Sequence, residues 1–208
     1  MVFVQEKYIN KYIGEIMMRF KRLWWTIRLC MIGDSMKRAD YVRTRDIYGF
    51  VGKNVSIMPR IVPLYSKLIK LNDNVRIASN VTFLTHDGIN YMLNNCSRTQ
   101  KKFKERIGCI EIGKNTFIGS GSTILYDVKI GENVIVGANS FLNHDLPSNG
   151  IYAGVPARKI GDYTYYVNKR IQEEEKGLIA TTEHNQSLTV DEIITAWKLF
   201  YDKRNSEK

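Results

Sequence analysis

A large aliphatic residue recurs at every sixth position between residues 112 and 142. A period of six fits neither the turn of an α-helix nor the simple alternation of a half-buried strand. A short fixed period predicts a repeat architecture, and the same phase returns in two earlier stretches of the chain. The positions that begin a six-residue unit are all apolar: Val51, Ile57, Leu71, Ile77, Phe83, Ile112, Ile118, Ile124, Ile130, Val136 and Leu142.

Each unit is expected to form a short strand followed by a corner. Its first residue points inward and stacks on its copies in neighbouring coils, about 4.8 Å apart. A glycine often comes second, which permits a positive φ or close approach of the next coil. The fifth place holds a small or aliphatic residue every time: Val55, Ile61, Val75, Val81, Thr116, Ser122, Val128, Val134, Ser140 and Leu146.

Three such faces close a triangular coil of about eighteen residues. The sequence therefore predicts a mainly β fold, a parallel β-helix, in preference to a sandwich rich in Ile and Val. From Ile57 to Leu71 the gap is fourteen residues rather than twelve, which predicts a two-residue insertion near residues 63–67.

Three segments carry a resemblance to a known family: "NVTFLTHDG" (80–88), "IGKNTFIGSGSTIL" (112–125) and "IYAGVPARKIG" (151–161). From about Val51 to Tyr163 the chain resembles the left-handed β-helix acyltransferases of the hexapeptide-repeat class. It looks most like the branch that holds galactoside, maltose and xenobiotic acetyltransferases. The resemblance implies acetyl-CoA as donor, a hydroxyl or amine acceptor, and a homotrimer with active sites between subunits. The cysteine spacing and the few histidines lead us to expect no metal.

His86 is the candidate general base. It stands at the fourth place of its unit, pointing outward, and it is the last repeat residue before residues 87–109 leave the phase. Histidine titrates near neutrality, which suits removal of a proton from an alcohol, although a solvated corner histidine fits the pattern equally well. The resemblance favours the base. Asp87 could contact the substrate or orient the imidazole, but an Asp before a turn glycine is more often a turn residue.

The resemblance also implies a donor site in the second half of the chain. Small residues there would let a narrow pantetheine arm lie against the backbone, and basic residues could pair with its phosphates. An aromatic residue would wall the acceptor site; many relatives have Trp where this chain has Phe117. The implied donor-site residues are Gly119, Ser120, Ala138, Asn143, His144, Gly154, Arg158 and Lys159, with a backbone N–H near Gly119–Ser120 facing the oxyanion.

The ends of the chain predict helices. Residues 5–32 carry an apolar stripe at helical spacing with Arg and Lys on the polar face. Such a helix packs on its own domain or a neighbouring subunit, or lies on an anionic membrane surface. Residues 188–203 predict a second amphipathic helix. We expect a helical segment at 1–48, the catalytic coil at 49–163 and a helical segment at 164–208.

The net charge of +10 suits an anionic partner, but no nucleic-acid motif accompanies it, so no nucleic acid is expected. Three widely spaced cysteines favour a reducing, cytoplasmic location, and the basic helix at residues 5–32 leaves the inner face of the membrane open as the place within it.

The predicted reaction is O-acetylation of a sugar hydroxyl, in a surface polysaccharide or its precursor. N-acetylation of an amino sugar, or acetylation of serine or a xenobiotic, is the alternative. A carbonic-anhydrase-like metal site would need His86, His144 and His184 to converge, and a scaffold without catalysis would not need His86 at all.

Overall fold

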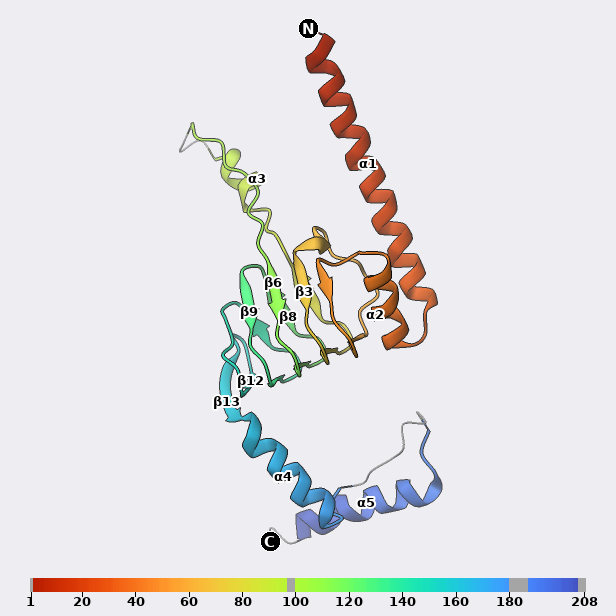
Figure 1. Ribbon diagram of the computed structural model, residues 1–208. Helices are drawn as coiled ribbons and strands as arrows, with labels where there is room; N and C mark the ends of the chain where they lie inside the picture. Colours follow the sequence, from red (N-terminus) through yellow and green to blue (C-terminus); the bar gives the residue numbers. More distant parts are fainter. Residues whose placement is uncertain (1, 97–99, 180–186, 206–208) are drawn as a thin grey trace. The chain divides into compact units, whose positions relative to one another are not determined.

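The computed structural model describes residues 2–96, 100–179 and 187–205 (Figure 1). Contacts divide the chain into two compact units, Met1–Gly161 and Asp162–Lys208. The first unit holds the repeats. The second is helical.

Short strands in the first unit form three sheets that the chain visits in turn. One sheet contains β1 (Phe50–Val51), β3 (Ile69–Leu71), β6 (Ile110–Ile112) and β9 (Val128–Ile130). The second contains β2 (Ser56–Ile57), β4 (Arg76–Ile77), β7 (Phe117–Ile118), β10 (Val134–Val136), β12 (Gly150–Ala153) and β13 (Arg158–Asp162). The third contains β5 (Thr82–Leu84), β8 (Thr123–Leu125) and β11 (Phe141–Leu142). The pairs that join successive coils are parallel, an arrangement consistent with a left-handed β-helix.

The pairing register gives the length of each coil. Ile110 pairs with Val128 eighteen residues on, which is three units. Phe50 pairs with Lys70, so the first coil holds two residues more. Lys70 pairs with Glu111, forty-one residues on, which leaves twenty-three residues, as many as 87–109 contain, outside the coil. The repeat thus continues in phase across an excursion longer than a coil.

All eleven first-place residues are buried, so the predicted inward stack is confirmed. The fifth-place residues are buried too, with one exception: Ile61 is 77% exposed, and Val62 is buried in its stead. The expectation for Ile61 was wrong because the extra residues of the first coil lie between Ile57 and Ile69, where the phase has already shifted.

The second-place glycines serve close approach rather than a positive φ. A Cβ on Gly113 would lie 2.5 Å from the carbonyl carbon of Gly131, and one on Gly119 would lie 2.5 Å from the nitrogen of Ala138. Neither glycine has a positive φ. The left-handed conformation occurs instead at the fourth place, at residues such as Asn115 (φ 55°). Asparagine tolerates this region better than other residues that carry a Cβ.

Five of these asparagines form a ladder along one corner of the coil. Each side-chain N–H2 donates to the next side-chain oxygen at 2.8–3.0 Å, in the order Asn54, Asn74, Asn115, Asn133 and Asn149. The ladder satisfies polar groups of consecutive coils, so it supports the stack of the apolar residues inside.

The helices are α1 (Val2–Met31), α2 (Ser35–Thr44), α3 (Ile89–Asn94), α4 (Tyr163–Glu175) and α5 (Val190–Asn205), with a 3-10 turn, η1 (Ser66–Leu68). Across the described residues the helices hold more of the chain than the strands do. The expectation of a mainly β protein was therefore wrong for the whole chain. Each repeat needs only two or three strand residues between its corners, whereas α1 alone is 30 residues long.

α1 and α2 each contribute buried side chains to the core of the first unit. Trp25 and Leu29 of α1 are buried in the same cluster as the coil residues. α2 packs on β1 and β2. Its Arg38 is fully buried and donates from Nε to the Ile57 carbonyl at 2.8 Å and from Nη1 to that of Gly33 at 3.0 Å. This one guanidinium joins the α1–α2 turn to the first coil.

The second unit begins with α4, capped by the Asp162 carboxylate, which accepts from the N–H groups of Thr164 and Tyr165. α5 begins after Thr189, whose N–H donates to Glu192 at 2.7 Å while the Glu192 N–H donates to Thr189 Oγ1. No helix among the described residues is both long and apolar enough to cross a bilayer.

Candidate active site

The predicted site residues lie on two different corners of the coil. His86 and Asp87 follow β5, and Asn143 and His144 follow β11 of the same sheet. We call these residues, with Tyr126 and Asp127 after β8, the histidine corner. The small-residue corner follows the second sheet and consists of Gly119, Ser120, Ala138 and Gly154. Within a single copy of the chain, these predicted residues therefore form two separate groups.

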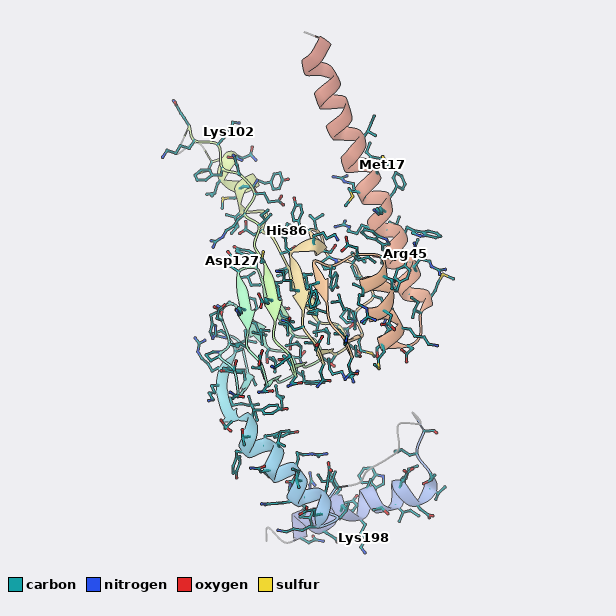
Figure 2. All side chains as sticks on the ribbon, viewed as in Figure 1. Met17, Arg45, His86, Lys102, Asp127 and Lys198 are labelled. Carbon is teal, nitrogen blue, oxygen red and sulfur yellow. The ribbon has the colours of Figure 1, made fainter. Side chains whose placement is uncertain are left out.

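His86 is half-buried at the base of the excursion (Figure 2). It forms an antiparallel bridge with Ile107, which holds the two ends of the excursion together. The ring of Tyr65 stands edge-to-face on the imidazole, with 5.5 Å between ring centroids, and the Tyr65 hydroxyl donates to Glu105 at 2.5 Å. The imidazole thus packs against a residue of the first-coil insertion, and the backbone of His86 pairs with the end of the excursion.

The Nδ1 atom of His86 is buried and has no hydrogen-bond partner among the described residues. A buried nitrogen left unpaired costs about 1–3 kcal/mol. Native proteins retain few such groups, and catalytic sites are among the places where they do. His86 is therefore not an ordinary solvated corner histidine.

Asp87 anchors the excursion to the coil. Its Oδ2 accepts from the Tyr126 hydroxyl at 2.5 Å and its Oδ1 accepts from the N–H of Ile89 at 3.1 Å. The hydrogen bond from Tyr126 lowers the pKa of Asp87, and the same bond raises the pKa of Tyr126. Arg106 lies over the Tyr126 ring, 5.0 Å from its centroid. Both oxygens of the Asp87 carboxylate thus accept hydrogen bonds that hold the turn and the excursion, as expected of a turn residue.

The small-residue corner is built by close backbone contact between coils. The N–H of Gly119 donates to Val136 at 2.9 Å, and the N–H of Asn139 donates to Ser120 at 2.8 Å. A Cβ on Gly137 would lie 3.0 Å from that of Ala153. Ser120, Ala138 and Gly154 are exposed on this corner, which leaves a surface with little side-chain bulk.

The basic and aromatic candidates flank that corner. Phe117 lies in β7, two residues before Gly119, and is 45% exposed. Arg158 and Lys159 are exposed in β13, which lies beside β12. Both cations are thus available to an anionic group near the last coil.

Asn143 and His144 stay on the histidine corner, two coils from His86. The Nδ1 atom of His144 lies 2.9 Å from Oδ1 of Asn143, and both side chains are exposed. The chain therefore places them apart from the small residues with which they were grouped.

Tyr65 and Tyr126 contact the predicted residues, and Glu105 accepts from Tyr65, but none of the three was predicted. Tyr126 could have been found from the repeat, because Leu84 pairs with Leu125 and the next residues follow in register. Tyr65 and Glu105 lie in the insertion and the excursion, where the phase carries no information. Their place depends on tertiary packing.

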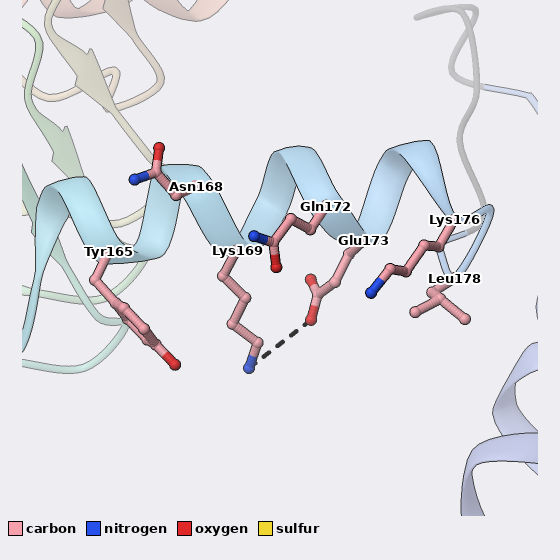
Figure 3. A pocket seen from close by; sticks show the side chains of 7 residues that line it. All are labelled: Tyr165, Asn168, Lys169, Gln172, Glu173, Lys176 and Leu178. Atoms are coloured by element: carbon pink, nitrogen blue, oxygen red, sulfur yellow. Dashed lines mark ion pairs between the residues drawn. The ribbon is translucent and has the colours of Figure 1, made fainter.

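A cavity of about 480 Å³ in the second unit contains none of the predicted residues (Figure 3). It lies along α4 and the turn after it, with Tyr165, Gln172 and Leu178 in its lining. Lys169 and Glu173 of its lining form an ion pair at 3.8 Å. This cavity is a depression between side chains of α4 and of the turn that follows it.

Within the described ranges, no three His, Cys, Asp or Glu side chains gather as a metal site would require. His184 lies outside the described residues. Cys30, Cys96 and Cys109 are free thiols.

The chain matches the family described as bacterial transferase hexapeptide (six repeats) over residues 109–144. These residues include three strand pairings eighteen residues apart: β6 with β9, β7 with β10 and β8 with β11. Residues 109–144 thus carry the hexapeptide repeat of bacterial transferases, in agreement with the three-sheet coil.

Two relatives match by sequence. Protein CapG of Staphylococcus aureus is 42% identical over 107 residues, which are 50% of this chain and 59% of that protein. YvoF of Bacillus subtilis (strain 168), named as a candidate acetyltransferase, is 30% identical over 128 residues, which are 61% of this chain and 64% of that protein. The chain thus spans less than two thirds of the length of either relative.

Solved structures of similar proteins include a maltose O-acetyltransferase from Clostridium difficile 630, with 25% identity and a TM-score of 0.48 over 69% of this chain and 87% of that one. AntD, an N-acyltransferase from Bacillus cereus in complex with dTDP and 3-hydroxybutyryl-CoA, has 20% identity and a TM-score of 0.46 over 67% of this chain and 96% of that one.

Proposed function

We propose that this hexapeptide-repeat protein is an acetyl-CoA-dependent acetyltransferase that acts on a sugar hydroxyl of a surface polysaccharide or its precursor. The observation that carries the proposal is His86, whose ring is positioned by Tyr65 and whose buried Nδ1 has no partner among the described residues. The family match and the "THDG" segment support an acyl-transfer role for that histidine.

In the proposed reaction the acceptor hydroxyl attacks the thioester carbonyl carbon of acetyl-CoA. The imidazole of His86 takes the hydroxyl proton as the C–O bond forms. When the tetrahedral intermediate collapses, the C–S bond breaks and the proton passes to the departing thiolate. We assign proton uptake to Nε2, because Nδ1 is closed off by the surrounding residues.

The developing oxyanion needs a donor that is not already engaged. The N–H of Gly119 is unsuitable because it donates to Val136. We therefore assign the role to Ser120, whose side chain is exposed on the same corner. Of the two residues that the resemblance implies as oxyanion donor, Gly119 and Ser120, we therefore keep Ser120.

The small-residue corner suits the pantetheine arm of acetyl-CoA. Its exposed residues are short, so a narrow chain could approach the backbone closely, and Arg158 and Lys159 offer cations for the nucleotide phosphates. Phe117 adds an apolar wall near the same corner.

Because His86 and the small-residue corner lie on different corners, we propose that each active site forms between two copies of the chain. A homotrimer closes such head-to-tail contacts with three equivalent sites. The histidine corner of one copy would then face the small-residue corner of its neighbour.

The test is thiol release from acetyl-CoA with a panel of sugars and amino sugars. Wild-type protein is expected to release thiol when a hydroxyl acceptor is present, and His86→Ala to fall by about a hundredfold or more, as for a lost general base. The modified atom, read by NMR of the product, separates O- from N-acetylation. Equal rates for His86→Ala and wild type would remove the histidine from the mechanism.

A further inference from the structure

The part of α1 from Ile13 to Met31 presents two opposite apolar faces. On one face Trp25 and Leu29 are 9% and 2% exposed, and they pack into the core of the first unit. On the other face, Phe20, Trp24 and Met31 are 68%, 59% and 70% exposed. With 3.6 residues per turn, eight exposed apolar residues fall on a single stripe about one third of the helix circumference wide, whereas Met18, 58% exposed, lies on the side of Trp25. This outer stripe consists of Ile13, Ile16, Met17, Phe20, Leu23, Trp24, Ile27 and Met31.

Basic residues border the outer stripe. Lys21 and Arg28 lie along one edge and Arg19 along the other, by the same helical spacing. Residues 16–31 contain no Asp or Glu. The helix therefore joins an apolar stripe to a positive margin, with tryptophan at the boundary.

A groove of about 630 Å³ between α1 and α2 extends this margin. Its lining includes the cations Lys21, Arg28 and Arg45 and the rings of Trp24, Trp25 and Tyr41 (Figure 2 labels Arg45, and Met17 on α1). The acidic residue of the groove, Asp46, forms an ion pair with Lys67. Trp24 belongs to both the stripe and the groove, so the two surfaces are continuous.

We propose that α1 docks the protein on an anionic phospholipid bilayer, with the outer stripe in the interfacial region and lipid phosphates at the groove. An apolar face with a basic margin and aromatic residues is how helices lie in the plane of an anionic membrane. Each Lys or Arg near such a surface adds to the attraction. A second copy of the chain is a poorer occupant, because its own α1 would bring the same positive margin into contact.

The experiment is co-sedimentation of the full chain with lipid vesicles. Wild-type protein is expected to sediment with mixed phosphatidylcholine–phosphatidylglycerol vesicles and about tenfold more weakly with phosphatidylcholine alone. The double variant Phe20→Ser/Trp24→Ser should bind both kinds of vesicle at least tenfold more weakly, because it loses apolar insertion. Lys21→Gln/Arg28→Gln should lose the preference for the anionic vesicles.

A matched control removes exposed apolar side chains from a different helix, α5. Ile194 and Trp197 of α5 are also exposed, and the variant Ile194→Ser/Trp197→Ser should sediment like wild type. An equal loss in this control would overturn the proposal, as would wild-type protein that stays in the supernatant with mixed vesicles. If Phe20→Ser/Trp24→Ser instead lowers the native mass in light scattering while wild type ignores vesicles, the stripe is a subunit contact and the proposal fails.

Discussion

His86 and Asp87 are neighbours in the chain, yet their side chains enter separate networks. The imidazole contacts Tyr65, whose hydroxyl reaches Glu105, whereas the Asp87 carboxylate accepts from Tyr126. The first network orients a ring and the second fastens a loop. Under the proposed function, Tyr65 is accordingly a positioning residue for His86.

The ring of Tyr65, rather than its hydroxyl, should matter for the rate. Tyr65 has φ 51°, so Tyr65→Gly removes the ring without straining the backbone. An edge-to-face pair contributes about 0.5–1.5 kcal/mol, so we expect kcat to fall about three- to tenfold in Tyr65→Gly. The KM for acetyl-CoA should not change, because the donor site lies on the other corner. Tyr65→Phe keeps the ring and should stay close to wild type; a Tyr65→Gly enzyme with wild-type kcat would show that the contact does not position the base.

At the scale of elements, the 87–109 excursion returns to the coil through paired ends. The N–H of Asp87 donates to Arg106 and the N–H of Gly108 donates to Thr85, both at 3.0 Å. Arg106 also forms a 3.5 Å ion pair with Asp127. These bonds hold both ends of the excursion beside His86, so the excursion helps to build the candidate site.

Loosening the Asp87–Tyr126 bond should free the base of the excursion. Tyr126→Phe is expected to speed tryptic cleavage after Lys104 or Arg106 a few-fold and to move the pKa of Asp87 up toward its ordinary value, as followed by NMR titration. Tyr91→Phe, on the exposed α3 of the same excursion, is the matched control and should cleave like wild type. Cleavage rates that do not differ between the two variants would contradict this anchor.

The same bond has a defined pH range. Because the pKa of Asp87 is lowered in the fold, its stabilising contribution is complete above the ordinary value of 3.8 and is lost as the pH falls through the lowered pKa. The pKa of Tyr126 is raised, so the contribution on that side is complete below 10.0 and is lost as the pH rises through the raised pKa. The difference in thermal stability between wild type and Tyr126→Phe should therefore disappear only at the acidic and basic extremes.

At the scale of the whole molecule, the separation of the two corners means that a site using both needs more than one copy of the chain. The parallel coils hold the histidine corner and the small-residue corner along separate edges of the sheets. A rearrangement that joined them within one copy would break the buried stack of aliphatic residues. A site that uses both corners is therefore a site shared between copies, as proposed above.

Shared sites predict complementation between inactive variants. His86→Ala and Ala138→Trp, which blocks the exposed small-residue corner, should each be inactive alone. When the two are co-expressed, about one site in four of a randomly mixed closed ring pairs an intact histidine corner with an intact small-residue corner. Thiol release should then recover to about a quarter of wild type. Mixtures that remain as inactive as their components would place the whole site within one copy.

The repeat could be predicted from the sequence because every six-residue unit begins with an apolar residue. Eleven apolar first positions predict the inward stack, and the fourteen-residue gap predicts the insertion. The six-residue repeat predicts nothing about segments that leave the coil. It therefore could not predict α2 with its buried Arg38, or the contacts of Tyr65 and Glu105.

The amino-acid sequence by itself thus determined the coil and the excursion, since both depend on local periodicity, whereas the choice of His86 as candidate base depended on the family resemblance of its segment. Tertiary structure alone decided that Asp87 fastens a loop, that Ile61 is exposed, and that the predicted residues divide between two corners. Those outcomes depend on which coils come into register across eighteen or more residues, and side-chain contacts over that distance are set by packing.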